Sequence, residues 1–266
     1  MGNALLCRSM RIRTIIALTG VAGLLLTGTA HAYPIKDKEL TKNALYESGE
    51  IAETECEEPP INDGDLTLAR KYWAGIQDCL NTAWETHLTQ AGLPFSEPTL
   101  KFGKIPRKFC GYTIAKESSM MYHCPASNTI VVQIGKDWVR QTDTLWEFYV
   151  IAQMYGYHVQ DLVGVEKAYQ KVPYANKNEM NEQIRRNFLQ TSCLSGVFMR
   201  SVWPSLDRSD KDWKELQSML KRSGDVKGEP RVYGKGSTMA YWTTRGYTTG
   251  DPASCNTWAA PASKVA

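Results

Sequence analysis

The hydrophobic positions between 147 and 164 predict one buried helix. Apolar side chains recur there at three- and four-residue steps, which is the spacing of a single helical face; they are Ile151, Tyr155, Val159 and Leu162. Gly156 lies in the middle of this stretch, where a glycine costs about 1 kcal/mol relative to alanine. We therefore expect another element to pack closely against the backbone at Gly156. We expect the helical region to extend back to 137, with a break near Asp143, which can cap the second part.

Three further stretches, 65–88, 177–203 and 209–222, show helical periodicity. The apolar face of the first consists of Leu66, Ala69, Trp73, Ile76, Leu80, Ala83, Trp84 and Leu88. Asp63 or Asp65 is expected to cap the start of this helix, and Gly92 with Pro94 to end it. We assign no helix or strand to 234–258, which is rich in Gly and Thr.

The region 98–134 is expected to hold the strands. Residues 129–134 are the clearest strand, because they are rich in β-branched side chains. Residues 108–115 and 120–122 are predicted to flank a turn at Ser118 and Ser119. The sequence therefore predicts an α+β fold, mostly helical, with a small sheet or hairpin region before the central helix.

The N-terminal residues 1–32 have the pattern of a secretory signal peptide. Arg8, Arg11 and Arg13 precede an apolar run over 14–30, and Ala30-His31-Ala32 forms an A-x-A cleavage site. An exported protein, secreted or otherwise extracytoplasmic, is the expectation; the alternative is that the apolar run stays as a membrane anchor. Residues 33–64 are expected to be an extended lead-in, and 259–266 a tail.

Removal of residues 1–32 changes the net charge of the chain and its number of cysteines. Without them the chain has 28 basic and 28 acidic residues, which gives no reason to expect a nucleic-acid partner. Six cysteines remain, and an even number in an exported chain indicates disulfides, although six cysteines allow 15 pairings. We expect the pairs Cys56–Cys79, Cys110–Cys124 and Cys193–Cys255. A thiolate zinc site is the alternative, but no C-x-x-C pair occurs.

Residues 151–160 read I-A-Q-M-Y-G-Y-H-V-Q. This segment resembles the active-site helix of the bacterial neutral zinc metallopeptidase family, which reads I-A-H-E-x-G-H-H-V-Q. In an H-E-x-x-H helix the two histidines bind zinc from one helical face and the glutamate is the general base. The resemblance therefore places Gln153 and Tyr157 at the two histidine positions, and Met154 at the position of the base.

Two later segments carry the same resemblance. Residues 188–197 resemble the family's E-L-Q-A-D-C-x-A-G-V, in which the glutamate is the expected third zinc ligand and the aspartate a supporting group. Phe188 and Ser192 stand at these two positions. Residues 241–247 and 250–258 resemble the family's closing segments W-x-x-R-G and G-D-P-x-x-C-D-T-F. The resemblance spans 65–258 and implies a zincin-like domain in which the active-site helix packs beside a small sheet; the disulfides expected above would cross-link this domain.

The departures from the family pattern fall where the chemistry is expected. An amide, a thioether, a phenol and a phenyl ring replace the zinc ligands and the base, so we expect no catalytic residue, no metal ligand and no cofactor. Zinc is expected only if this ligand assignment is wrong. Met, Tyr and Phe fill such a space with apolar volume. The leading hypothesis is an exported, inactive homologue that binds a peptide or an envelope protein through the remodelled groove.

Two other functions stay open. One is an active metallopeptidase or other hydrolase with relocated groups, for which Glu147, Tyr157, His158 and His123 are the candidates. For His158 a structural hydrogen bond is the simpler interpretation, and His87 is interpreted as structural. The other is a purely structural envelope protein. A packed cluster of replaced residues favours that function, whereas an open, aromatic-lined cleft favours binding.

Overall fold

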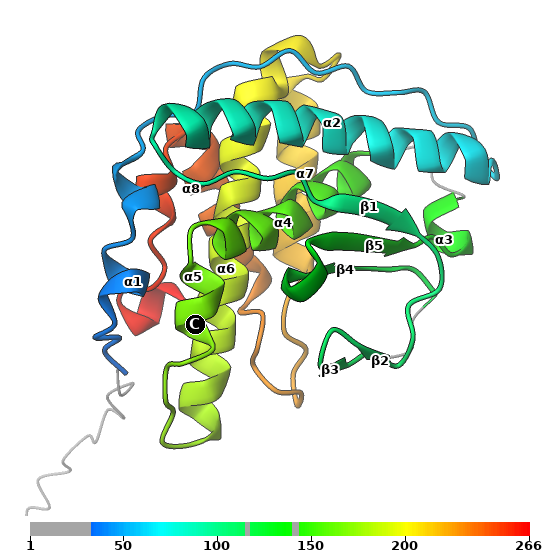
Figure 1. Cartoon of the computed structure of the whole chain (residues 1–266). Coiled ribbons are helices and arrows are strands. Elements are labelled where there is room, and N and C mark those ends of the chain that lie inside the picture. Colours follow the sequence, from blue (N-terminus) through cyan, green and yellow to red (C-terminus); the bar gives the residue numbers. More distant parts are fainter. Residues whose placement is uncertain (1–32, 115–117, 140–143) are drawn as a thin grey trace, which may run out of the picture. The chain divides into compact units, whose positions relative to one another are not determined.

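The computed structural model of the chain describes residues 33–114, 118–139 and 144–266. The predicted signal peptide and Asp143 lie outside these described residues. The helices are α1 (Lys38–Thr41), α2 (Leu66–Gln90), α3 (Lys136–Val139), α4 (Leu145–Leu162), α5 (Val165–Tyr169), α6 (Lys177–Val202), α7 (Asp210–Arg222) and α8 (Gly236–Thr249). The strands are β1 (Thr99–Phe102), β2 (Lys108–Phe109), β3 (Tyr112–Thr113), β4 (Met120–Cys124) and β5 (Thr129–Gln133). Figure 1 shows α2 lying across α4 and α6, with the sheet beside them.

The helices at the predicted positions are confirmed. In α2 the expected apolar face is buried except for Leu66, the first helical residue, which is 40% exposed. Asp65 caps this helix, because its side chain accepts hydrogen bonds from Thr67 N and Leu68 N at 2.8 and 3.0 Å. Asp63 does not have this role. Helix α4 begins after Thr144 and is separate from α3.

The strand pairing corrects the predicted hairpin. Strand β2 pairs with β3 across the two-residue turn Cys110-Gly111, so the turn is not at Ser118 and Ser119. Strand β4 pairs antiparallel with β5, and β5 also pairs in parallel with β1. The resulting sheet has the order β1-β5-β4. Together with the helices it makes an α+β fold, as expected.

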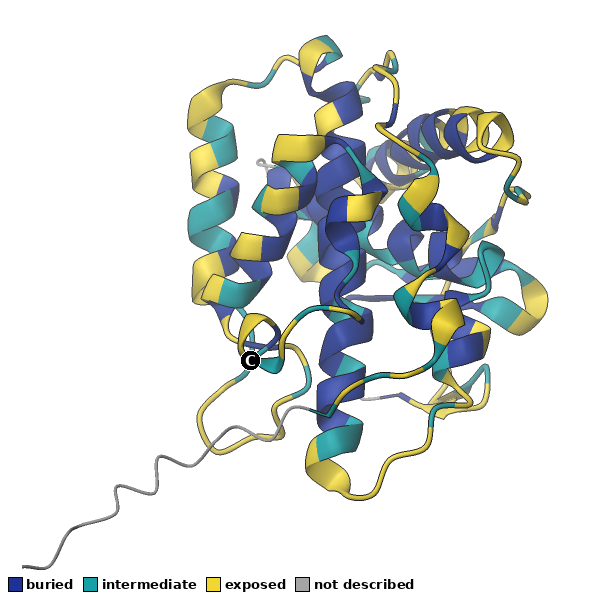
Figure 2. Cartoon of the chain, turned by 90° about the vertical axis from the view of Figure 1, so that its left-hand side faces the viewer, coloured by how far each residue is buried: buried dark blue, intermediate teal, exposed yellow. Residues whose placement is uncertain are grey.

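Helix α6 forms the centre of the helical core. Figure 2 shows one helix that is dark blue along most of its length, in agreement with the many buried residues of α6. Gly156 permits the approach of α6 to α4, because a Cβ there would lie 3.0 Å from Thr191 Cβ. This close packing was expected from the sequence.

Helix α8 was not predicted, and its glycines explain why. A Cβ at Gly246 would lie 2.0 Å from the carbonyl oxygen of Cys193, and a Cβ at Gly196 would lie 2.1 Å from that of Thr243. The backbones of α6 and α8 therefore touch at these two residues. Glycine weakens a helix considered alone, but here only glycine allows the crossing.

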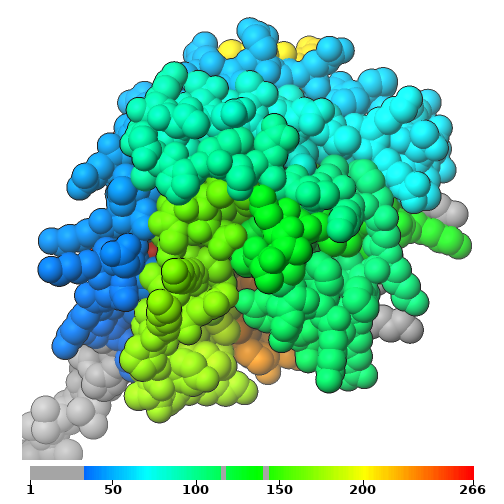
Figure 3. Space-filling model, in the orientation of Figure 1, coloured from blue at the N-terminus to red at the C-terminus, as the bar shows by residue number. Residues whose placement is uncertain are grey.

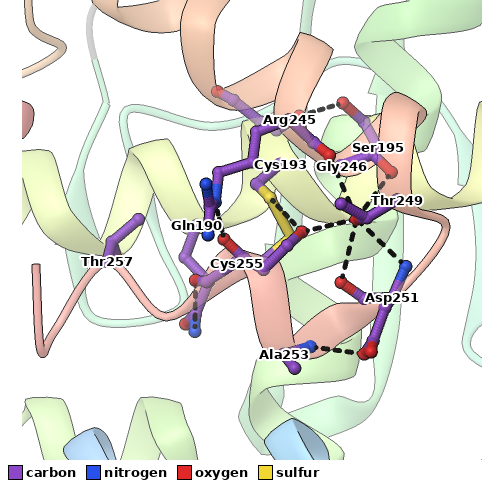
Figure 4. The surroundings of a disulfide bond; sticks show 12 residues. Gln190, Cys193, Ser195, Arg245, Gly246, Thr249, Asp251, Ala253, Cys255 and Thr257 are labelled. Carbon is purple, nitrogen blue, oxygen red and sulfur yellow. Dashed lines mark hydrogen bonds between the residues drawn. A yellow bond between two sulfur atoms is a disulfide. The ribbon is translucent and has the colours of Figure 1, made fainter. Parts of the chain in front are cut away.

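Three disulfides join the pairs Cys56–Cys79, Cys110–Cys124 and Cys193–Cys255. This is the pairing that the sequence predicts, so these cysteines do not form a thiolate zinc site. Figure 4 shows the third bond, which joins α6 to the 3-10 turn η4 (Pro252–Cys255). Around it, Arg245 Nε donates to Ser254 O at 2.8 Å, and Asp251 Oδ1 accepts from Ala253 N at 2.8 Å. Residues 241–247 and 250–258, which resemble the family's closing segments, thus form the region around the bond between α6 and η4.

The segments on both sides of 65–258 pack onto the helices. Between 33 and 64 lie α1 and the 3-10 turn η1 (Ala44–Glu47), and Leu40 and Leu45 are fully buried. At the other end, Val265 is fully buried and its carbonyl accepts a 2.9 Å hydrogen bond from Arg185 Nε. Within the described residues, none of the helices has the length and apolar character needed to cross a membrane.

Candidate functional site

A cleft of about 330 Å³ opens beside the C-terminal half of α4. Its aromatic lining consists of Tyr112, Tyr122, Tyr157, Tyr169, Phe188 and Tyr233. The other lining residues are Met121, His123, Pro125, Gln153, Met154, Glu166 and Asn187. They come from β3, β4, the 3-10 turn η2 (Pro125–Ser127), α4, α5, α6 and the loop after α7. Figure 3 shows that loop, in orange, between the yellow-green α5–α6 region and the blue-green β2–β3 region.

The positions singled out by the motif come together in this cleft. Gln153, Met154 and Tyr157 line it from α4, and Phe188 lines it from α6. Ser192 is fully buried behind them. Gln153 Nε2 donates to Ser192 Oγ at 2.7 Å, and Ser192 Oγ donates to the carbonyl oxygen of Phe188 at 3.2 Å. An amide and a hydroxyl thus pair where the family pattern has histidine and aspartate.

These residues do not fit a zinc ion. Catalytic zinc requires three protein ligands, and Phe188 has no donor atom. Gln153 offers only an amide oxygen, a much weaker zinc ligand than an imidazole nitrogen, and its amide nitrogen donates to Ser192 Oγ. Burial raises the pKa of the Tyr157 phenol, so it stays protonated and a poor ligand. Among the described residues there is no group of three His, Cys, Asp or Glu side chains suited to a metal ion.

Two of the relocated-site candidates, His123 and His158, lie together. Their ring centroids are 5.2 Å apart in an edge-to-face arrangement. His158 Nε2 donates to the carbonyl oxygen of Ser96 at 2.8 Å, the structural hydrogen bond that its sequence position suggested. Burial lowers the pKa of His158 to about 4, and burial together with the neighbouring His158 lowers that of His123 to about 3. Both rings are therefore neutral at pH 7.

The remaining candidates do not complete a hydrolytic site. Glu147 is buried in the first turn of α4 and does not line the cleft. Tyr157 lines the cleft, but no described lining residue is Ser, Thr, Cys, Lys or Asp. His87 lies elsewhere, with its Nε2 2.8 Å from Ser48 Oγ. Glu147 thus lies away from the other candidates, and the cleft, although His123 and Tyr157 both line it, offers no nucleophile paired with a base.

The two buried histidines predict a loss of stability in mild acid. Their folded pKa values lie below the value of about 6.5 expected in the unfolded chain. Between pH 6.5 and 4 the unfolded state therefore binds more protons, and the free energy of unfolding falls as the pH falls. Urea unfolding at pH 7.5, 6 and 5 measures this slope. The double variant His123→Gln/His158→Gln should show a clearly flatter slope, and an unchanged slope contradicts the assignment.

Several lining residues have no signal in the sequence pattern. Tyr112, Glu166, Tyr169, Asn187 and Tyr233 belong to four segments that only the fold brings together. The chain has 13 tyrosines, but that number alone does not indicate which of them line a cleft.

A family model described as putative neutral zinc metallopeptidase matches residues 11–258. The chain therefore belongs to this family. The uncharacterized protein YpfJ of Escherichia coli is 26% identical over 262 residues, which cover 92% of this chain and 84% of YpfJ. The uncharacterized protein Rv2575 of Mycobacterium tuberculosis is 31% identical over 170 residues, or 52% of this chain and 55% of Rv2575. No solved structure matches the chain, so the zincin-like character of the fold stays a prediction.

Proposed function

We propose that this protein is an exported, catalytically inactive member of its family, which binds a peptide segment of another protein through the cleft. The observation that carries this proposal is that Gln153, Met154, Tyr157 and Phe188 line one cleft of about 330 Å³. Concave, mostly apolar sites with a few polar groups are typical of ligand binding. The four positions that would carry out peptide hydrolysis in the family pattern are therefore suited, in this chain, to bind a peptide.

Inactivity is inferred from the chemistry of the replaced residues. Met154 has no group that accepts a proton from water at neutral pH, and the positions of the zinc ligands do not fit the ion. Export is inferred from the signal-peptide pattern together with the three disulfides, which persist in oxidising compartments.

The open rim of the cleft favours binding over a purely structural function. Tyr112, from β3, and Tyr233, from the loop after α7, both line it and are each 49% exposed. Two tyrosines that serve only to stabilise the fold are expected to be buried, because an aromatic side chain stabilises a protein mainly through the surface that it buries. Exposed tyrosines at the rim of a cavity are suited to contact a partner.

Selection of displayed random peptides on the immobilised protein tests this function. Met154→Trp adds a bulky ring inside the cleft, and we expect it to weaken the selected peptides at least about tenfold. Leu66→Trp, at the exposed start of α2, is the matched control and should leave affinity unchanged. Equal affinity for both variants, or no enrichment, contradicts the proposal. Zinc-dependent peptide hydrolysis that a chelator abolishes contradicts the inactivity.

A further inference from the structure

The inner part of the cleft holds a buried carboxylate surrounded by aromatic rings. Glu166, on α5, lines the cleft and is 8% exposed. Burial and, to a smaller extent, the charge of Glu166 raise the pKa of Tyr112, Tyr157 and Tyr169. Three phenol rings, from three different elements, are therefore close enough to interact electrostatically with this one carboxylate. Phe188 and Tyr233 continue the aromatic wall, with ring centroids 4.9 Å apart.

The carboxylate of Glu166 has hydrogen-bond partners but no cation. Its Oε1 accepts from Gln170 Nε2 at 2.9 Å, and its Oε2 accepts from Asn187 Nδ2 at 3.3 Å. Among the described residues it forms no salt bridge, and no lining residue is Lys or Arg. Burial raises its pKa accordingly. A buried carboxylate without a positive partner is costly, so a bound cation here gains more than it does at an exposed site.

A second unpaired acceptor lies beside this carboxylate. Asn187 is 7% exposed and lines the cleft, and its Oδ1 has no hydrogen-bond partner among the described residues. Because its amide nitrogen donates to Glu166, the free oxygen belongs to the same group of polar atoms. The inner cleft thus presents acceptor oxygens and aromatic faces, and both attract a cation that carries N–H donors.

We propose that this part of the cleft binds an alkylammonium group, presented as a lysine side chain of the bound peptide. The inference rests on the proposed peptide-binding function and specifies what the peptide contains. Aromatic rings around a carboxylate are the arrangement that holds ammonium ions. The ammonium has three donors on a compact head. A guanidinium fits less well, since its planar fork needs both carboxylate oxygens, and each already accepts one hydrogen bond.

Two blocked pentapeptides, Ala-Ala-Lys-Ala-Ala and its norleucine counterpart, test this inference. They share the carbon chain and differ in the amine. NMR titration of the natural protein should show at least about tenfold tighter binding of the lysine peptide. Glu166→Gln should abolish that preference, whereas Glu229→Gln, at an exposed carboxylate outside the cleft, should keep it. Tyr112→Leu, at the exposed rim, should weaken the lysine peptide roughly fivefold without affecting the core.

The outcomes separate this inference from the proposed function. Equal binding of the two peptides leaves peptide binding intact and overturns the lysine assignment. A preference that survives Glu166→Gln, or an arginine peptide that binds as tightly as the lysine peptide, also overturns it. If neither peptide binds but peptides selected from a random library bind at the cleft, the lysine assignment alone fails. If no peptide of either origin binds, both fail. Thermal unfolding of each variant confirms that the fold is retained.

Discussion

Removal of the Cys193–Cys255 disulfide is expected to lower the free energy of unfolding by about 4 kcal/mol. The bond joins residues separated by 62 positions, and both cysteines are fully buried between α6 and η4. In the chain-entropy model, cross-linking stabilises a protein by restricting its unfolded state, and the gain increases with loop length. The bond ties α6 to η4, the turn that follows α8.

Guanidinium unfolding of Cys193→Ala/Cys255→Ala measures this loss. The matched control is Cys110→Ala/Cys124→Ala, which removes a bond between residues 14 positions apart. That bond holds the β2–β3 hairpin to the end of β4, and on the same model it contributes about 3 kcal/mol. The hairpin is a separate two-stranded sheet, so its release should cost less than loss of the bond between α6 and η4. A larger loss for the control contradicts this account of the core.

Arg186→Ala is expected to destabilise the protein by about 3–5 kcal/mol. Arg186 is 2% exposed, and its Nη2 donates to Glu182 Oε1 at 2.7 Å. Its Nη1 donates to the carbonyl oxygen of Ala260 at 2.8 Å and also to that of Thr257. One guanidinium therefore pairs a buried carboxylate and fixes the C-terminal segment. Its removal leaves the charge of Glu182 buried without a partner.

A double variant separates these two contributions. Replacing both partners of a buried ion pair by apolar residues is often close to neutral. Arg186→Met/Glu182→Met should therefore recover part of the stability that Arg186→Ala loses, and the remaining deficit reports the carbonyl contacts. Urea unfolding of the three proteins gives these values. A loss below about 1 kcal/mol for Arg186→Ala would place its guanidinium in the range of exposed ion pairs and contradict the assignment.

The sequence indicated the elements whose patterns are local. Helices α2, α4, α6 and α7 have apolar faces that repeat at helical steps, and β5 is a run of β-branched residues. Helix α8 was not predicted because glycine has a low helix propensity. Gly246 is needed for the close approach of α8 to α6, and local propensity does not reflect a contact between helices. The hairpin was misplaced because β4 pairs with a strand that follows it. Strand pairing depends on contacts between distant segments, and residue types within one segment do not determine it.

The sequence predicted the candidate site only at the residues that belong to a family motif. The spacing of Gln153 and Tyr157 places both on one helical face, and the later motif adds Phe188; the structure brings all three to one cleft. Glu166 and Asn187 carry the ligand preference that we infer, yet no spacing relates them to the motif. Their proximity results from the packing of α5 on α4 and α6.

We infer that the positions of the family's metal centre line a binding cleft in this protein. The zinc content of the purified natural protein and of its Gln153→His/Met154→Glu/Tyr157→His/Phe188→Glu variant tests it most directly. We predict no bound zinc in the natural protein and about one zinc per chain in the variant, which regains three ligands and the base. Stoichiometric zinc in the natural protein, or none in a folded variant, would contradict the claim.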